Sequence, residues 1–248
     1  MNYENIIYEQ RGAIAIITLN RHEKKNAINQ KMNLELIQAV EEVEKDDNTK
    51  ALVLTGGREC FSSGADLAEV SSSDAGKPTG PSAMDKIVDM AKPTIAAISG
   101  WCVAGGLELA LCCDLRVASE TARIGDAHIR MGLIGGAGSP TRLARLSGVS
   151  YAKELILTGD SIDGKEAYRV GIVNQVFPLD KFMEGAIELA TKITNNSLLA
   201  LKLSKKVINA AADMDEHQSI QYTNTVINEL LASAEYKERI ATFLRKNK

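Results

Sequence analysis

The chain has 248 residues, a size that allows one large domain or two smaller ones. Hydrophobic residues make up 45% and charged residues 25%, a globular composition that excludes disorder and coiled coil. A net charge of −3 excludes a globally basic nucleic-acid binder, and with aromatic residues at only 4% the core is expected to be aliphatic.

Strand and helix patterns alternate in the first half of the chain. Apolar β-branched runs predict buried strands, and apolar residues at three- and four-residue steps predict helices. The predicted strands are residues 13–19, 51–55, 94–98 and 115–119, and the predicted helices are residues 26–46, 84–91 and 105–112. This alternation predicts an α/β fold.

The second half of the chain is predicted to be mainly helical. Helical patterns cover residues 141–146, 152–157 and 165–170, and almost all of 180–248. We therefore predict a core over residues 1–195 and an appended helical region over residues 196–248. The Ser-, Gly- and Pro-rich stretch 71–82 is expected to be a mobile loop.

The cysteines and the apolar runs indicate the cellular setting. Four cysteines without CxxC spacing predict buried free thiols and hence a cytoplasmic protein; they are Cys60, Cys102, Cys112 and Cys113. The apolar run 94–113 contains Glu108 and several glycines, which favours a buried strand–turn–helix over a membrane span. The polar, acidic start of the chain does not have the pattern of a signal peptide.

Two small-residue turns follow predicted buried strands. One is CFSSGADL at 60–67, and the other is GWCVAGGLE at 100–108. Small residues let backbone amides approach a ligand closely, and a helix start adds unpaired donors and a positive dipole end. If the two turns converge, they form an oxyanion hole.

Glu108 follows the second turn and has two possible explanations. A carboxylate in the first turn of a helix is commonly there only because the helix dipole favours it. However, its neighbours Leu107, Leu109, Ala110 and Leu111 are apolar all round, so the helix is expected to be buried. A buried carboxylate needs a partner or a chemical function.

The sequence resembles the enoyl-CoA hydratase/isomerase (crotonase) family over its full length. The matching segments are LNRHEKKNAIN (19–29), ALVLTGGRECFSSGADL (51–67), PTIAAISGWCVAGGLELALCCDLRVAS (93–119) and IGDAHIRMGLIGGAGSPTRLARLSG (124–148). The resemblance implies a core spiral of ββα turns followed by a helical region that forms homotrimers, often paired as hexamers. It also implies binding of acyl-CoA thioesters and stabilisation of their enolates.

The resemblance also implies roles for individual residues. The oxyanion-hole amides are those of Ala65 and Gly105, and Glu108 stands at a catalytic glutamate of the hydratases. The residues implied to bind coenzyme A are Lys25, Ala27, Ala65, Asp66 and Leu67.

One departure from the family pattern concerns the second catalytic glutamate. Where hydratases carry a Gln-Pro-Glu-like pattern, this chain has Asp126-Ala127-His128, and Gly135 stands where the family usually has proline. Imidazole can accept or donate a proton near neutral pH, so His128 is the predicted catalytic partner of Glu108. A purely structural histidine, or Asp126 in the acid–base role, stay open as alternatives.

The sequence thus predicts a lyase that hydrates or dehydrates a conjugated enoyl-CoA, with cyclic or dienoyl chains among the candidates. An enoyl-CoA isomerase needs only one base and remains an alternative, as does a non-catalytic acyl-CoA-binding relative. Three scattered histidines and no ligand-spaced cysteines predict no metal site. No cofactor is expected other than the coenzyme A carried by the substrate, and no nucleic acid or membrane partner.

Overall fold

The computed structural model describes residues 3–72 and 82–246. The strands are β1 (Ile6–Arg11), β2 (Ile14–Leu19), β3 (Ala51–Thr55), β4 (Cys60–Ser62), β5 (Thr94–Ile98), β6 (Trp101–Val103), β7 (Leu115–Ser119), β8 (Arg123–Gly125) and β9 (Gln175–Phe177). The helices are α1 (Gln30–Lys45), α2 (Leu67–Ser72), α3 (Ala83–Asp89), α4 (Gly105–Cys112), α5 (Ser139–Ser147), α6 (Val149–Thr158), α7 (Gly164–Arg169), α8 (Phe182–Thr194), α9 (Leu198–Ala211), α10 (Glu216–Ala232) and α11 (Ala234–Lys246), with 3-10 turns at His22–Lys24 and His128–Met131.

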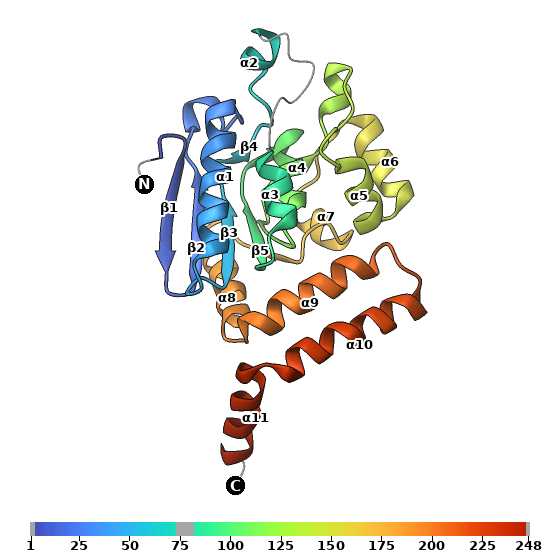
Figure 1. Ribbon diagram of the computed structural model, residues 1–248. Coiled ribbons are helices and arrows are strands. Elements are labelled where there is room, and N and C mark those ends of the chain that lie inside the picture. The colour runs from blue at the N-terminus through green and yellow to red at the C-terminus, as the bar shows by residue number, and fades with distance from the viewer. Residues whose placement is uncertain (1–2, 73–81, 247–248) are drawn as a thin grey trace.

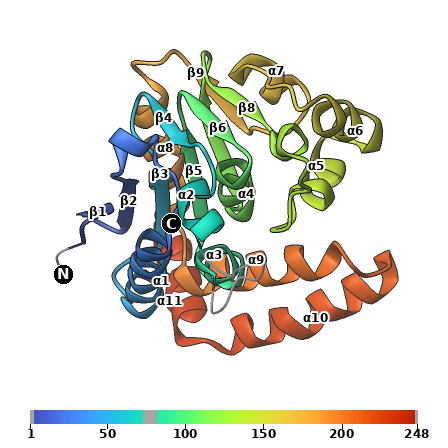
Figure 2. The same ribbon diagram turned by 90° about the horizontal axis from the view of Figure 1, so that it is seen from above.

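The chain winds between two sheets. The larger sheet has the order β1-β2-β3-β5-β7-β9, and the smaller has the order β4-β6-β8. Only β1 and β2 are antiparallel, and the remaining pairs are parallel. Each of β3, β5 and β7 in the larger sheet is followed directly by a strand of the smaller one, so the chain advances as a spiral (Figure 2).

Apolar side chains cover both faces of the larger sheet. Along β2, Ala15 and Ile17 face the main core with α1 and α4, whereas Ile14 and Ile16 face α8. This is the two-residue alternation of a strand that is buried on both sides. The aliphatic core that the composition predicts is therefore present.

Glycines form the corners where the chain leaves the larger sheet. A Cβ at Gly56 would overlap the carbonyls of Cys60 and Phe61, and a Cβ at Gly100 would overlap the carbonyl of Glu59. Gly100 also has φ +58°, a conformation that favours glycine. Both corners pack against the start of β4, and both predicted ligand-binding turns follow them.

The last three helices extend from the core (Figure 1). Helix α9 is attached to it by Lys205, whose ammonium lies 2.7 Å from Asp114 Oδ2. Within the described part of these three helices, the buried apolar residues are Leu203 in α9 and Val226 in α10. Within the described ranges, no helix is both long and apolar enough to cross a bilayer.

Most predicted elements are present, with differences that have local causes. The helix predicted from residue 26 begins at Gln30, because Lys25 and Asn26 both adopt left-handed conformations that end the preceding 3-10 turn. The short strands of the smaller sheet were not predicted, since three residues are too few for a visible periodicity. Strand β1 was also not predicted, because most of its six residues are polar or exposed.

The predicted loop 71–82 is only partly described. Ser71 and Ser72 end α2, Ser82 caps α3 by accepting from Met84 N, and residues 73–81 lie outside the described residues. All four cysteines are free and buried, as predicted.

Candidate active site

Ala65 lies in the turn between β4 and α2, where it pairs with Ile28. In this parallel bridge Ile28 N donates to Gly64 O at 2.7 Å, and Asp66 N donates to Ile28 O at 3.0 Å. Because the bridge uses the groups on either side of Ala65, the amide of Ala65 points away from Ile28. Ala65 is an exposed residue, and no hydrogen bond joins its N–H to another described residue.

Gly105 begins α4, where the first amides of a helix have no partner inside it. The preceding Ala104 adopts φ 49° and ψ −125°, in a region that residues with a Cβ rarely occupy. Such a conformation costs about 1–3 kcal/mol and is typical of functional sites. Glu108 N donates to Ala104 O at 3.1 Å, whereas no hydrogen bond joins Gly105 N to another described residue.

The two turns are in contact, so the amides of Ala65 and Gly105 are brought together. A Cβ at Gly105 would lie 3.3 Å from Ala65 N, and a Cβ at Gly64 would lie 2.9 Å from Gly105 N. Gly64 has φ +101°, which favours glycine at this crossing. Two main-chain donors without a partner among the described residues therefore lie close together, which is the arrangement that a polarised carbonyl oxygen requires.

Glu108 lies one turn into α4, whose eight residues are all buried. Its carboxylate is held on one side: Oε1 accepts from Ala137 N at 2.7 Å and lies 3.4 Å from Ser139 N. Both donors stand at the start of α5, where unpaired amides and the helix dipole favour a negative charge. Arg142 Nη1 stabilises the loop before α5 by donating to Ala137 O at 2.5 Å. The other oxygen, Oε2, faces His128.

His128 begins the 3-10 turn after β8 and lies between two carboxylates. Its Nε2 is 3.6 Å from Glu108 Oε2, which is too long for a direct hydrogen bond and leaves both groups able to share a water. Its Nδ1 is 2.6 Å from Asp126 Oδ1. Ser139 Oγ donates to Asp126 Oδ2 at 2.5 Å, which completes a connected cluster of four side chains.

The cluster changes the proton affinity of its members. The hydrogen bond with Asp126 raises the pKa of His128 above its ordinary value; burial opposes this effect, and the charge of Glu108 adds to it. Burial raises the pKa of Asp126, but the hydrogen bonds from His128 and Ser139 outweigh it and leave this pKa below its ordinary value. The arrangement therefore favours an imidazolium held by carboxylates.

The residues predicted on the coenzyme A side divide into two groups. Lys25 and Leu67 are exposed near Ala65. Ala27 is buried, and its carbonyl accepts from Arg21 Nη1 at 2.9 Å. The same Arg21 group lies 2.8 Å from Asp66 Oδ2, and this bond lowers the pKa of Asp66. Ala27 and the side chain of Asp66 are thus already engaged within the protein.

Sequence reasoning missed Ala137 and Ser139, which hold the two carboxylates. The signal available for them was Gly135, the glycine that stands where the family usually has proline. A Cβ at Gly135 would overlap Ser139 Oγ and would lie 3.0 Å from Glu108 Oε1.

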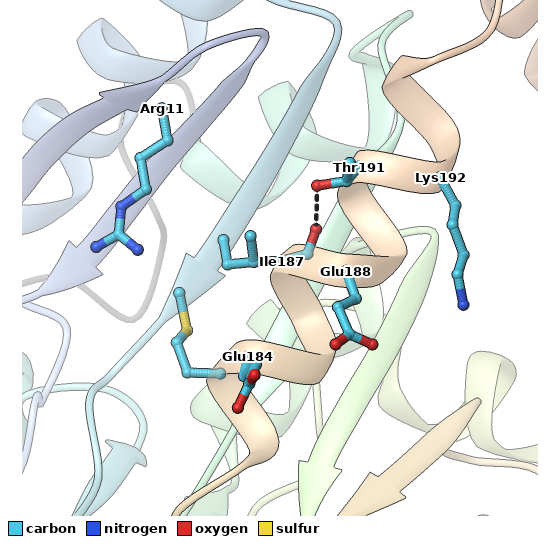
Figure 3. A pocket seen from close by; sticks show the side chains of 7 residues that line it. Arg11, Glu184, Ile187, Glu188, Thr191 and Lys192 are labelled. Carbon is cyan, nitrogen blue, oxygen red and sulfur yellow. Dashed lines mark hydrogen bonds between the residues drawn. The ribbon is translucent and has the colours of Figure 1, made fainter.

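A surface groove lies apart from this cluster, between the end of β1 and the outer side of α8 (Figure 3). Thr191 Oγ1 in this groove donates back to Ile187 O of its own helix at 2.8 Å. The described residues that line the groove are Arg11, Met183, Glu184, Ile187, Glu188, Thr191 and Lys192. None of them belongs to the cluster around Glu108, so the groove is separate from the candidate active site.

Known proteins resemble this chain over its whole length. The profile of the family described as "Enoyl-CoA hydratase/isomerase" matches residues 9–248. The short-chain-enoyl-CoA hydratase of Clostridium acetobutylicum is 34% identical over 254 residues, covering 100% of this chain and 97% of that protein. The mitochondrial enoyl-CoA hydratase of Pongo abelii is 36% identical over 253 residues, covering 100% and 87%.

Solved structures confirm the predicted fold. The crystal structure of an enoyl-CoA hydratase from Bacillus anthracis superposes with a TM-score of 0.91 at 32% identity, covering 98% of this chain and 97% of that one. The resemblance that the sequence motifs indicate is thus confirmed by family profile, by sequence and by fold. The chain therefore belongs to the enoyl-CoA hydratase/isomerase family and is an enzyme of the hydratase kind.

Proposed function

We propose that this protein adds water across the conjugated double bond of an enoyl-CoA thioester, or removes it. The observation that carries the proposal is the convergence of two unpaired amides with a carboxylate–imidazole pair. The turns that carry the amides of Ala65 and Gly105 are in contact where α4 begins, and Glu108 lies one turn further along the same helix.

The two amides polarise the thioester oxygen. Each oxyanion-hole donor typically stabilises the transition state by about 2.7–4 kcal/mol, because the donor points at negative charge that develops on the oxygen only in the transition state. Withdrawal of electrons into this oxygen makes Cβ electrophilic and allows Cα to carry the enolate.

Glu108 and His128 then handle the two protons of the reaction. In hydration, Glu108 Oε2 takes a proton from the water as its oxygen bonds to Cβ, and the imidazolium Nε2 of His128 gives a proton to Cα of the enolate. In dehydration the same groups act in reverse. The raised pKa of His128 supports its role as the acid, since the imidazolium then persists to higher pH than in an unperturbed histidine. Asp126 is fully buried with both oxygens occupied, which favours His128 over Asp126 for contact with substrate.

The rest of the substrate is assigned to the exposed rim beside Ala65. Lys25 and Leu67 are exposed and can contact the coenzyme A portion. Ala27 and Asp66 both bind Arg21, and in this way they stabilise the turns next to Ala65. The acid–base pair and the amides supply the chemistry, so we propose no cofactor beyond the coenzyme A of the substrate. Four free thiols support a cytoplasmic location.

We further propose that residues 196–248 form the contact region of a homotrimer, which can pair into a hexamer. Helix α11 exposes the apolar side chains of Ile240, Phe243 and Leu244, and Figure 1 shows it extending away from the core. Exposed apolar residues on a helix with few core contacts are typical of subunit interfaces.

Steady-state kinetics on linear, dienoyl and cyclic enoyl-CoA thioesters tests the proposal. The unsaturated rings and dienes are included because an imidazole replaces the second glutamate of the family pattern. We expect Glu108→Gln and His128→Gln each to reduce kcat by about 10²–10⁴-fold, the usual contribution of a general acid or base. His217→Gln, at an exposed position in α10, serves as the control and is expected to leave kcat unchanged.

The same assays separate the alternatives. Deuterium from heavy water entering the product without an added hydroxyl group would identify an isomerase, for which Glu108 alone suffices. Tight binding of every thioester, with no turnover and no effect of Glu108→Gln, would identify a non-catalytic binding protein.

A further inference from the structure

Asp126 and Ser139 are both fully buried and lie behind His128 as seen from Glu108. Asp126 Oδ1 accepts from His128 Nδ1 at 2.6 Å and from His128 N at 3.1 Å. Asp126 Oδ2 accepts from Ser139 Oγ at 2.5 Å. With both oxygens bound, the carboxylate of Asp126 cannot rotate without breaking a hydrogen bond.

This anchoring determines which nitrogen of His128 faces the reaction. A carboxylate on Nδ1 keeps a proton there, so Nε2 is the nitrogen that gains and loses the exchangeable proton. Nε2 is also the nitrogen that faces Glu108 Oε2, at 3.6 Å. The ring is thus held in one tautomer and one orientation.

The hydroxyl of Ser139 occupies space that only a glycine at position 135 leaves open. A Cβ at Gly135 would overlap Ser139 Oγ and would lie 3.1 Å from Asp126 Oδ2. A side chain at position 135 and the present hydroxyl at position 139 therefore exclude each other. The departures from the family pattern at Asp126, His128 and Gly135 are connected physically through Ser139.

We propose that Ser139 and Asp126 are positioning residues that hold Nε2 of His128 toward the α-carbon of the substrate, and that Gly135 is required to admit the Ser139 hydroxyl. The proposal rests on the proposed function, because the orientation of His128 matters for turnover only if His128 transfers the α-proton.

The charged groups around His128 come from each neighbouring element. Glu108 faces it from α4, and Asp126 faces it from the segment after β8. Arg130, in the same 3-10 turn, is paired at 2.8 Å with Asp160 after α6. Arg142 of α5 donates to the loop carbonyl of Ala137. Among the charged groups of the described residues, Glu108 and Asp126 are the two that lie within 4 Å of the imidazole nitrogens.

The experiment combines nitrogen-15 NMR of histidine side chains with kinetics on the full-length protein. The sequence contains only three histidines, so His128 can be assigned by comparison with His128→Gln. In the parent protein above the pKa of His128, we expect a protonated Nδ1 and an unprotonated Nε2. In Ser139→Ala we expect a mixture of tautomers, with kcat about 10-fold lower and KM within about twofold of the parent.

A matched control lies on the same helix. Ser147 Oγ donates to Leu143 O at 2.9 Å inside α5, so Ser147→Ala removes a partly buried, hydrogen-bonded hydroxyl that is not part of the cluster around His128. It is expected to leave the spectrum and kcat unchanged. Asp126→Asn is the second variant: its amide can donate to Nδ1, so we expect the tautomer to reverse and kcat to fall further than in Ser139→Ala.

If Ser139 and Asp126 had only a structural role, their substitution would change the stability of the protein but not the tautomer of His128. An unchanged His128 spectrum in both Ser139→Ala and Asp126→Asn would overturn the proposal, whatever happens to kcat. If no thioester is turned over but the tautomer responds as expected, the proposed function fails and the positioning of His128 stands, because NMR reads the resting protein.

Discussion

Gly105→Ala is expected to disable the oxyanion hole without disturbing the fold. The added Cβ would lie 3.3 Å from Ala65 N and 3.3 Å from Gly64 Cα. An oxyanion must approach to about 2.7–3.1 Å from the same amide, so the methyl group and the thioester oxygen compete for one position.

The magnitude follows from the loss of one donor. An amide that no longer reaches the oxygen forfeits about 2.7–4 kcal/mol of transition-state stabilisation, or about 10²–10³-fold in kcat. The two contacts at 3.3 Å are closer than ordinary van der Waals contact, so the Gly64 turn must move by a few tenths of an ångström. The preference of alanine over glycine in a helix, up to about 1 kcal/mol, offsets this cost, and the change in stability should be small. Gly105 is not among the residues with positive φ, so alanine can adopt its backbone conformation.

Two other glycines provide the controls. A Cβ at Gly136 would meet nothing within 4 Å, so Gly136→Ala should retain the parent kcat and melting temperature. A Cβ at Gly106 would overlap Ser62 O, so Gly106→Ala should lower the melting temperature sharply. Hydration kinetics and thermal unfolding by circular dichroism are measured on all three variants. A folded Gly105→Ala protein with kcat within about threefold of the parent would refute the oxyanion-hole reasoning.

Three further outcomes are expected. In the hydration direction His128 must be protonated, and because its pKa is raised, kcat should fall with rising pH at a higher pH than an unperturbed histidine would give; a kcat that increases as the pH rises through the pKa of His128 would contradict its role as the acid. Asn26 is fully buried with φ 51°, and its side-chain amide contacts the carbonyls of Gly56, Cys60 and Phe61. Asn26→Ala should therefore lower the free energy of unfolding by about 2–4 kcal/mol in urea denaturation, and a loss below about 0.5 kcal/mol would disagree. Phe243→Asp should shift the particle mass measured by light scattering toward smaller species, whereas an unchanged mass would exclude this face of α11 from the subunit contact.

Much of the fold could be predicted because its signals are local. Strands β2, β3, β5 and β7 and helix α4 each lie within a few residues of the predicted bounds, since apolar periodicity and flanking glycines are properties of short windows. Strand β1 was missed because exposed polar residues dominate its pattern. The short strands of the smaller sheet form only where the corner glycines place them beside one another.

The candidate site was predictable in part for the same reason. Glu108 could be expected to be buried because the helix around it is apolar on every side, and a buried carboxylate must be bound. The pairing of Glu108 with His128 was expected only from the family pattern. That Ala137 would hold Oε1 and leave Oε2 toward His128 could not be foreseen, since these residues are 20 or more positions from Glu108 and lie on separate elements.

Sequence alone established an α/β chain with two glycine turns, a helix carrying an isolated acid, and an imidazole at the position of a second glutamate. Tertiary structure decided that the two turns touch, that Asp126 binds His128 from behind, and that Ser139 fits only because Gly135 has no side chain. The physical reason is that residue type and spacing limit which groups are present, whereas hydrogen bonds and steric exclusion depend on ångström-scale distances that arise only when separate elements pack.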